Sequence, residues 1–224
     1  MRKNREIKII FILLAVFFLA FLALPMIMVL ARSFTADGTA GITFSNYVEV
    51  LTEKGFLQAL GNSLLISVCS ALVTTVPAFI LAYTIHYTNV GRRYKKLVEK
   101  AAVLPMLLPT ITYGFAIIYS FGNEGLLTKL FGRKLFDIYG FNGLLLGYVI
   151  YTLPISFMLI HNAMGYIDKR FMIVSRLMGD SPLQTFRMTI LTPLLGTLAA
   201  SFIQTFFLCF TDFGIPASVG GQFE

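Results

Sequence analysis

The chain has 224 residues, of which 57% are hydrophobic and only 13% are charged. Soluble proteins carry about 25% charged residues, so this composition excludes a water-soluble globular protein and indicates an integral membrane protein. The formal net charge is +7, but Lys and Arg lie in short blocks between apolar runs, which indicates membrane topology rather than nucleic-acid binding.

Five apolar stretches are long enough to cross a bilayer as helices, which takes about 20 residues each. None of them contains Asp, Glu, Lys or Arg, and they cover residues 9–31, 63–87, 101–121, 141–163 and 189–210. The first follows a basic N-terminus, but it is longer than the apolar run of about 7–15 residues in a cleaved signal peptide. We therefore predict an all-α integral membrane protein with five transmembrane helices, the first of them a retained anchor.

The basic residues alternate in number from one side of the predicted membrane to the other. The N-terminus and the loops after the second and fourth spans contain four, five and four Lys or Arg residues, whereas the other loops together contain five. Because loops rich in Lys and Arg stay in the cytoplasm, this pattern predicts a cytoplasmic N-terminus and an external C-terminal end.

The loop between the fourth and fifth predicted spans is the most informative part of the predicted cytoplasmic side. Asp168 is placed to cap a short amphipathic helix over about residues 169–178. Gly179 stands where the C-terminus of that helix needs a left-handed residue, and Ser181 and Pro182 are typical of the start of a second helix. We predict a helix, a glycine turn and a second helix, whose apolar face either binds a protein partner or lies on the bilayer surface.

This loop resembles the coupling motif of the inner-membrane permease subunits of ABC importers. In that family an EAA triplet is followed three residues later by a glycine and about a dozen residues after that by a proline. Gly179 matches the glycine, Pro193 matches the proline one position late, and Ile173-Val174-Ser175 replaces the triplet without its acidic residue. Over about residues 60–221, further similarities are Asn62-Ser63-Leu64, the LPMLLP run at 104–109 and Leu153-Pro154.

The resemblance implies that the loop forms short coupling helices that dock on a cytoplasmic ABC ATPase dimer. The residues that it assigns to this coupling are Asp168, Arg170, Ser175, Arg176, Gly179, Asp180, Ser181 and Pro182. It further implies a second permease subunit or half, an extracytoplasmic substrate-binding protein and a place in the lipid bilayer of a bacterial inner membrane. The chain contains no P-loop sequence, so we expect no enzymatic activity in this chain and ATP hydrolysis on a separate subunit. We expect no cofactor, no resident metal and no nucleic-acid partner.

The run TDFGIPASVGG at residues 211–221 resembles one branch of this family, whose members take up ferric iron, phosphonates such as 2-aminoethylphosphonate, or polyamines. The resemblance favours 2-aminoethylphosphonate, followed by iron(III). Asp212 lies at the outer end of the fifth predicted span, where an ionisable residue is a functional candidate. It either lines the substrate pathway or is a solvated residue at a helix end.

The core of this family usually has five helices after an anchoring one, whereas only four predicted spans follow the anchor here. We therefore expect an N-terminal anchor and external loop over residues 1–60 and a permease core over residues 61–224 that lacks the sixth helix. The chain would then be a truncated subunit or the first half of a longer permease. Two alternatives are an ion-coupled secondary carrier, which would commonly place ionisable residues near the bilayer midplane, and a non-transporting membrane scaffold.

Overall fold

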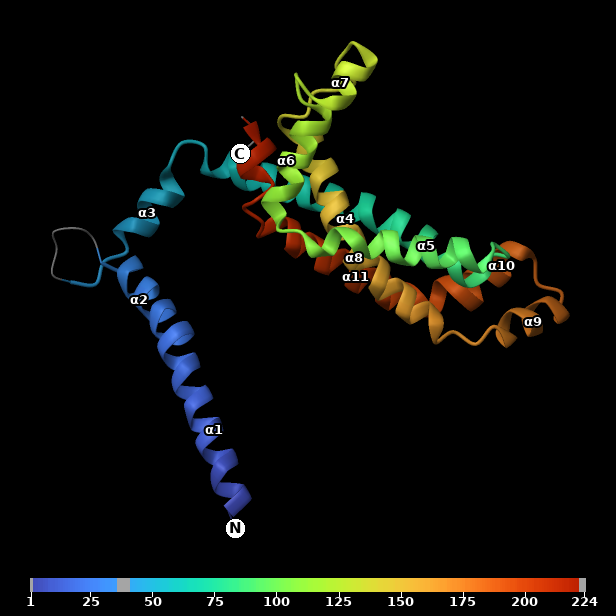
Figure 1. Cartoon of the computed structure of the whole chain (residues 1–224), viewed down its shortest axis with the longest axis horizontal. Coiled ribbons are helices and arrows are strands. Elements are labelled where there is room, and N and C mark those ends of the chain that lie inside the picture. Colours follow the sequence, from blue (N-terminus) through green and yellow to red (C-terminus); the bar gives the residue numbers. More distant parts are fainter. Residues whose placement is uncertain (1, 36–40, 222–224) are drawn as a thin grey trace. The chain divides into compact units, whose positions relative to one another are not determined.

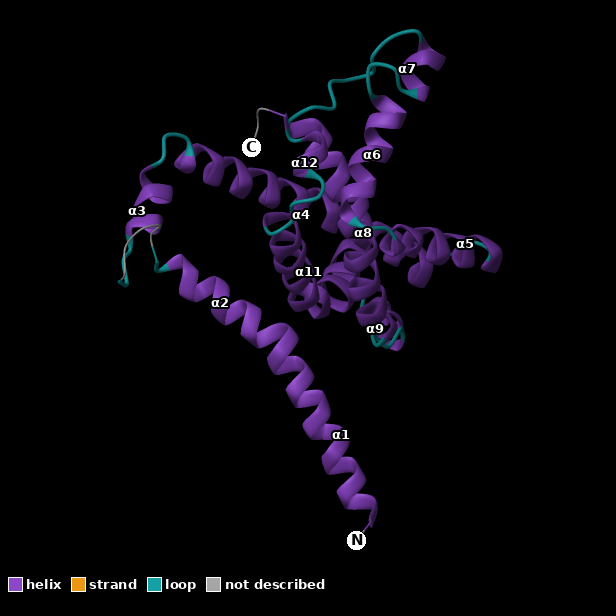
Figure 2. Ribbon diagram, turned by 60° about the vertical axis from the view of Figure 1, so that its left-hand side comes forward, coloured by secondary structure: helices purple, strands orange, loops and turns teal. Residues whose placement is uncertain are grey.

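The computed structural model describes residues 2–35 and 41–221, so residues 222–224 of the predicted core lie outside the described part. All regular structure in the described residues is helical, as the ribbon in Figure 2 shows. By their internal contacts the residues divide into two units, Met1–Gln58 and Ala59–Glu224. The prediction of an all-α protein is therefore confirmed.

The first unit contains a long apolar helix followed by a short one. The long helix consists of α1 (Arg2–Phe18), a π-helical turn η1 (Leu19–Ala23) and α2 (Leu24–Ser33), and its large apolar side chains are exposed. Such all-round apolar exposure suits a helix surrounded by lipid. The short helix α3 (Ser45–Thr52) is tied to the end of α2, because the Asn46 amide donates to the carbonyl oxygens of Ser33 and Thr35 at 3.2 and 3.1 Å.

The second unit is built around three long helices, α4 (Phe56–Tyr87), α8 (Phe141–Gly165) and α11 (Thr192–Phe210), which lie side by side (Figure 1). Small residues of α4 are completely buried at this interface, which allows close approach of the helices. Buried hydroxyl pairs also link the helices: Thr74 with Thr152 at 3.1 Å, and Ser156 with Thr205 at 2.8 Å. These small side chains and hydroxyl pairs lie beside large buried residues such as Tyr148, Phe157 and Leu194, which fill the rest of the core.

The third predicted span, residues 101–121, contains Pro105 and Pro109 and is a broken helix. The chain forms α5 (Arg92–Val103), a 3-10 turn η2 (Leu104–Leu107), α6 (Thr110–Phe121) and α7 (Leu126–Phe131), with a bend of 108° at the break. Leu108 and Pro109 are extended there, because the ring of a proline disfavours helical backbone in the residue before it. In the described residues four helices are long and apolar enough to span a membrane, or five if this bent pair is one span.

Three shorter segments complete the second unit. On the predicted cytoplasmic side lie α9 (Arg170–Leu177) and α10 (Pro182–Phe186), and a π-helical turn η3 (Arg187–Leu191) joins α10 to α11. At the other end of α11 the chain turns back into the short helix α12 (Pro216–Val219), which packs on α6 and α8. The predicted functional residues all lie in these two end regions.

Candidate functional site

The loop that begins after α8 opens with an aspartate at the start of α9. The Asp168 carboxylate accepts a hydrogen bond from the backbone N–H of Arg170 at 2.9 Å. α9 begins at Arg170 and ends at Leu177, one residue inside the predicted range at each end, and its N-cap position is Lys169. Asp168 thus satisfies one of the free N–H groups at the helix start from a position one residue further out than a standard N-cap.

Gly179 ends α9 in a left-handed turn with φ of +86°. The N–H of Gly179 donates to the carbonyl of Arg176, and the N–H of Asp180 donates to the carbonyl of Ser175, both at 3.1 Å. These two bonds make a Schellman motif, which closes a helix and fixes the direction of the next segment. A Cβ on Gly179 would meet no atom within 4 Å, so the cost of replacing this glycine lies in the backbone conformation alone.

A buried cluster of hydroxyl groups locks the two short helices together. The Ser175 hydroxyl donates to a carboxylate oxygen of Asp180 at 2.6 Å and lies 3.0 Å from the hydroxyl of Thr185. Ser175 and Thr185 are only 7% and 2% exposed. On the far side of the turn, the Ser181 hydroxyl accepts from the N–H of Gln184 at 3.3 Å, with Pro182 in the first helical position. We call this rigid unit, residues 168–186, the loop element.

Thr185 is a member of the cluster that the sequence did not indicate. It lies ten residues after Ser175, on the other side of the glycine turn. No local pattern marks such a pair, because the two hydroxyl groups meet only through the angle that the turn imposes. The sequence did indicate Ser175 itself, as the last residue of the altered triplet.

The outer surface of the loop element is apolar and has no cover in the described part of the chain. Its exposed large apolar residues are Phe171, Val174, Leu177, Met178 and Leu183. Leu177, Met178 and Leu183 are each more than three-quarters exposed. Arg170 is exposed as well, and the single ion pair among the described residues joins Lys129 to Glu124 elsewhere. Contiguous exposed apolar groups of this kind indicate a binding surface.

The loop element is attached to the bundle at two places. The Lys169 ammonium donates to the carbonyl of His86 at the end of α4 at 2.8 Å. The ring of Phe186 packs edge-on against Phe79 and Tyr83 of α4, with centroid separations of 6.2 and 5.7 Å. The loop element is therefore in direct contact with α4 and is joined through η3 to α11.

At the opposite end of the bundle, Asp212 is half-buried and hydrogen-bonded. One of its carboxylate oxygens accepts from the N–H of Ile215 at 2.9 Å, which fixes the turn into α12. Asp212 also lines a cavity of about 240 Å³, together with Asn62, Tyr148 and Cys209 among others. The carboxylate therefore takes part in the turn at the helix end and borders this cavity.

The segment that follows Asp212, which we call the outer segment (residues 211–221), packs tightly on α6 and α8. Ile215 and Val219 are completely buried, and the carbonyl of Val219 accepts from the N–H of Gly140 at 2.7 Å. A Cβ on Gly147 of α8 would lie 2.8 Å from a methyl carbon of Ile215, so this close approach requires glycine. The run of residues that resembled a family signature thus has a packing role.

Together these features define the class: a multi-pass helical membrane protein with a structured helix pair at one end of its bundle and a folded-back segment at the other. The family model described as "Binding-protein-dependent transport system inner membrane component" matches residues 78–223. The match covers well over half of the chain and includes both the loop element and the outer segment. The chain belongs to this family and is a multi-pass protein of the bacterial inner membrane.

Individual relatives agree with the family assignment. The chain is 29% identical over 220 residues to the ferric transport system permease protein FbpB 1 of Haemophilus influenzae, covering 95% of this chain and 34% of the relative. It is also 29% identical over 220 residues to the ferric permease FbpB of Actinobacillus pleuropneumoniae, covering 95% and 31%. The chain thus spans about a third of the length of these relatives.

A solved structure shows the same fold. The crystal structure of a bacterial ABC transporter involved in the import of the acidic polysaccharide alginate matches with a TM-score of 0.70 at 16% identity. The match covers 100% of this chain and 85% of that chain. At this level of identity the likeness concerns the fold.

Proposed function

We propose that the chain is a transmembrane permease part of an ATP-binding-cassette importer. It passes a substrate delivered by an extracytoplasmic binding protein across the inner membrane, driven by a separate cytoplasmic ATPase dimer. One observation carries the proposal: the loop element is internally locked by polar contacts and exposes a large apolar surface on the predicted cytoplasmic side. Membership of the permease family supports it.

The loop element has the properties of a mechanical lever. Its two helices are joined by the Schellman turn at Gly179 and by the buried contacts of Ser175 with Asp180 and Thr185. Because a buried hydrogen-bonded network resists deformation, a push on its outer surface moves it as one body. The Lys169 and Phe186 contacts then transmit that movement to α4, so closure of the ATPase dimer changes the packing of the bundle.

The ATPase would bind the exposed apolar residues at the tip of the loop element. Leu177, Met178 and Leu183 are the most exposed of them and fit an apolar groove. Arg170 takes part as an exposed cation at the edge of this surface. The acidic residue of the family triplet is absent, so in this chain the docking contact is dominated by apolar side chains.

A second permease half or subunit would complete the pathway. The chain spans only about a third of its ferric relatives. Residues of α4 and α11 such as Leu72, Val76 and Phe207 are large, apolar and more than half exposed. Such a surface suits either lipid or the helices of a second half.

For the substrate we propose iron(III), which is supported by the ferric transport relatives that align with 95% of the chain. The second candidate, 2-aminoethylphosphonate, rests on the resemblance of residues 211–221 to one branch of the family. Asp212 would line the outer part of the pathway, because its carboxylate borders the cavity beneath the outer segment. A carboxylate there attracts a metal cation or the ammonium group of an aminophosphonate.

Uptake in cells tests the function and separates the two substrates. The gene that encodes this chain is deleted in the bacterium that carries it, and uptake of radiolabelled iron(III) and of labelled 2-aminoethylphosphonate is measured. We expect a loss of iron uptake that the intact gene restores, with 2-aminoethylphosphonate uptake unchanged. The reverse pattern would identify 2-aminoethylphosphonate as the substrate and would leave the importer proposal unchanged. If uptake of neither label depends on the gene, and the purified ATPase partner does not bind the chain, the importer proposal is wrong.

A further inference from the structure

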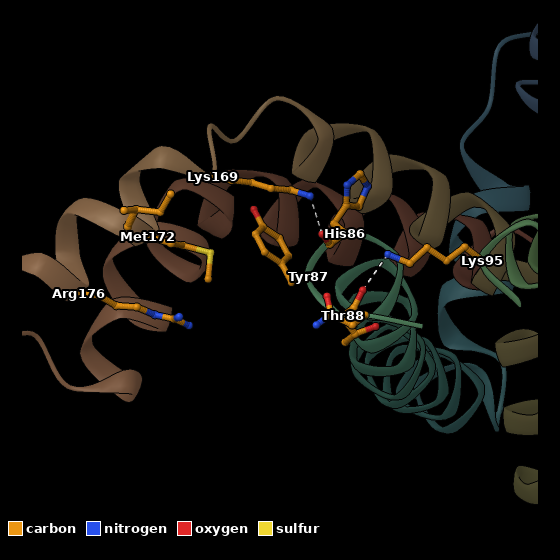
Figure 3. Close-up of a pocket in the computed structure, with 9 residues that line it drawn as sticks. His86, Tyr87, Thr88, Lys95, Lys169, Met172 and Arg176 are labelled. Carbon is orange, nitrogen blue, oxygen red and sulfur yellow. Dashed lines mark hydrogen bonds between the residues drawn. The ribbon is translucent and has the colours of Figure 1, made fainter. Parts of the chain in front are cut away.

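A second pocket, separate from the apolar tip, lies between the end of α4 and the inner side of α9. It has a volume of about 380 Å³. Figure 3 shows Met172 and Arg176 of α9 reaching toward Tyr87 and Thr88 at the end of α4. Its lining residues are His86, Tyr87, Thr88, Asn89, Lys95, Lys169, Met172, Ile173 and Arg176.

The pocket is strongly cationic. Lys95, Lys169 and Arg176 contribute three positive charges, and none of the described residues that line the pocket is acidic. Three cations around one small space repel one another, because a partly desolvated site screens charges less than water does. An anion placed between them would turn this repulsion into attraction.

Two of these cations are held in fixed positions by the backbone. The Lys95 ammonium donates to the carbonyl of Thr88 at 2.9 Å and also to that of Ile85, and the Lys169 ammonium donates to that of His86. These bonds satisfy carbonyl groups at the C-terminus of α4, where cations are favourable. An ammonium group has three donors, so each lysine keeps at least one for a ligand.

Arg176 has no such internal role. Within the described residues its guanidinium makes no hydrogen bond and no ion pair, although it can donate five hydrogen bonds. The Tyr87 hydroxyl, also part of the lining, is buried and has no hydrogen-bond partner in the described part of the chain. Both groups are free to bind an oxygen anion, and a guanidinium binds phosphate through two parallel hydrogen bonds.

The position of the pocket identifies the source of the anion. α4 is apolar up to Tyr83 and Tyr87, aromatic residues of the kind that mark the membrane–water boundary. The helix that follows, α5, combines exposed Lys and Arg residues with the exposed apolar side chains of Tyr94 and Leu97, which are 50% and 65% exposed. Ala102 of α5 packs in the core of the bundle, while the Lys and Arg residues at its start lie beside the end of α4, where they attract the anionic headgroups of the cytoplasmic leaflet.

We propose that this pocket binds the phosphate group of an anionic phospholipid from the cytoplasmic leaflet. Arg176 binds two phosphate oxygens from α9, while Lys95 and Lys169 bind the headgroup from the side of α4. The lipid then bridges the loop element and the bundle, and it stabilises one position of α9 relative to α4. This inference concerns lipid binding and stands independently of the transported substrate.

Lipid binding to the purified full chain tests the proposal. The chain is held in a neutral detergent at physiological salt, and binding of added phosphatidylglycerol or phosphatidylcholine is measured by native mass spectrometry. We expect preferential binding of phosphatidylglycerol, and Arg176→Gln should weaken it about tenfold, since a charge-assisted bidentate contact is lost. The matched control is Lys96→Gln, which removes one charge from an exposed position of α5 outside the pocket, with an effect of at most about twofold.

Each other outcome overturns the proposal. Equal weakening by Arg176→Gln and Lys96→Gln would show diffuse attraction to the basic surface instead of a site. Equal binding of the two lipids would exclude headgroup recognition. If millimolar inorganic phosphate displaces phosphatidylglycerol and binds equally well alone, the ligand is free phosphate. Arg176 is exposed and unpaired, so its substitution leaves the fold intact. A second variant, Lys169→Gln, should also weaken phosphatidylglycerol binding, and circular dichroism checks that it is folded.

Discussion

The loop element and the outer segment both reverse the chain direction at an end of the same bundle. They differ in which side chains they bury and which they expose. The loop element buries Ser175 and Thr185 and exposes its large apolar residues. The outer segment buries Ile215 and Val219 completely against α6 and α8. A turn with a polar interior and an apolar exterior leaves apolar surface for a protein partner or the bilayer to cover, whereas a turn with an apolar interior covers these side chains itself.

The largest expected effect on stability comes from disturbing the packing of the outer segment. Gly147→Leu would place side-chain atoms where Ile215 and Ile117 already pack, and overpacking of this kind costs about 3 kcal/mol. We expect a corresponding loss of stability in detergent unfolding followed by circular dichroism. The control is Gly196→Leu in α11, where a Cβ would meet no atom within 4 Å. Equal destabilisation by both substitutions would contradict the tight packing of the outer segment.

The polar interior of the loop element is tested by Ser175→Ala. This change removes two hydrogen bonds and leaves the buried Thr185 hydroxyl without this partner, at a cost of about 2 kcal/mol. A double-mutant cycle combines Ser175→Ala with Thr185→Val. We expect a coupling energy of at least about 0.5 kcal/mol between the two sites. Additive effects would mean that the two hydroxyl groups do not support each other.

A smaller loss of stability is expected at the turn itself. Gly179→Val forces a β-branched residue into a left-handed conformation, which costs about 1–2 kcal/mol. With the ATPase present, we expect ATP hydrolysis to continue while uptake is lost, because the two helices no longer move as one body. The matched control is Gly132→Val, which is also left-handed with φ of +65° and in open space but lies outside the loop element. Normal uptake in Gly179→Val would refute the role of the loop element as a lever.

The smallest structural effect is expected for Asp212→Asn. The amide oxygen can still accept the hydrogen bond from Ile215, so stability should change by less than about 0.5 kcal/mol. Removal of the negative charge should nevertheless lower uptake severalfold if the carboxylate lines the pathway. Unchanged uptake would leave Asp212 with only its role in the turn.

Local chemistry explains which parts of this structure the sequence could predict. The glycine turn and the Ser181 cap depend on neighbouring residues, and the structure contains both. The prolines at 105 and 109 mark the break in the third span, but the size of the bend does not follow from composition, because it depends on the backbone conformation of Leu108 and Pro109.

Contacts between distant residues could not be predicted in this way. The pairing of Ser175 with Thr185 depends on the angle of a turn, and the approach of Ile215 to Gly147 joins residues far apart in the chain. The cationic pocket brings together Lys95 of α5 and Arg176 of α9. In each case the residue types were visible in the sequence, but their meeting point was not.

The wide turn η3 lies in the stretch where the proline of the resembling coupling motif falls one position late. A π-helical turn holds one residue more than an α-helical turn over the same rise, and η3 lies between Gly179 and Pro193. A turn of this kind can hold one additional amino acid as a local bulge without changing the register of the helices on either side. Deleting a single residue from 187–191 should close the bulge into a regular helix. The loop element would then keep its length and its orientation, and only the numbering of the residues after the deletion would shift by one.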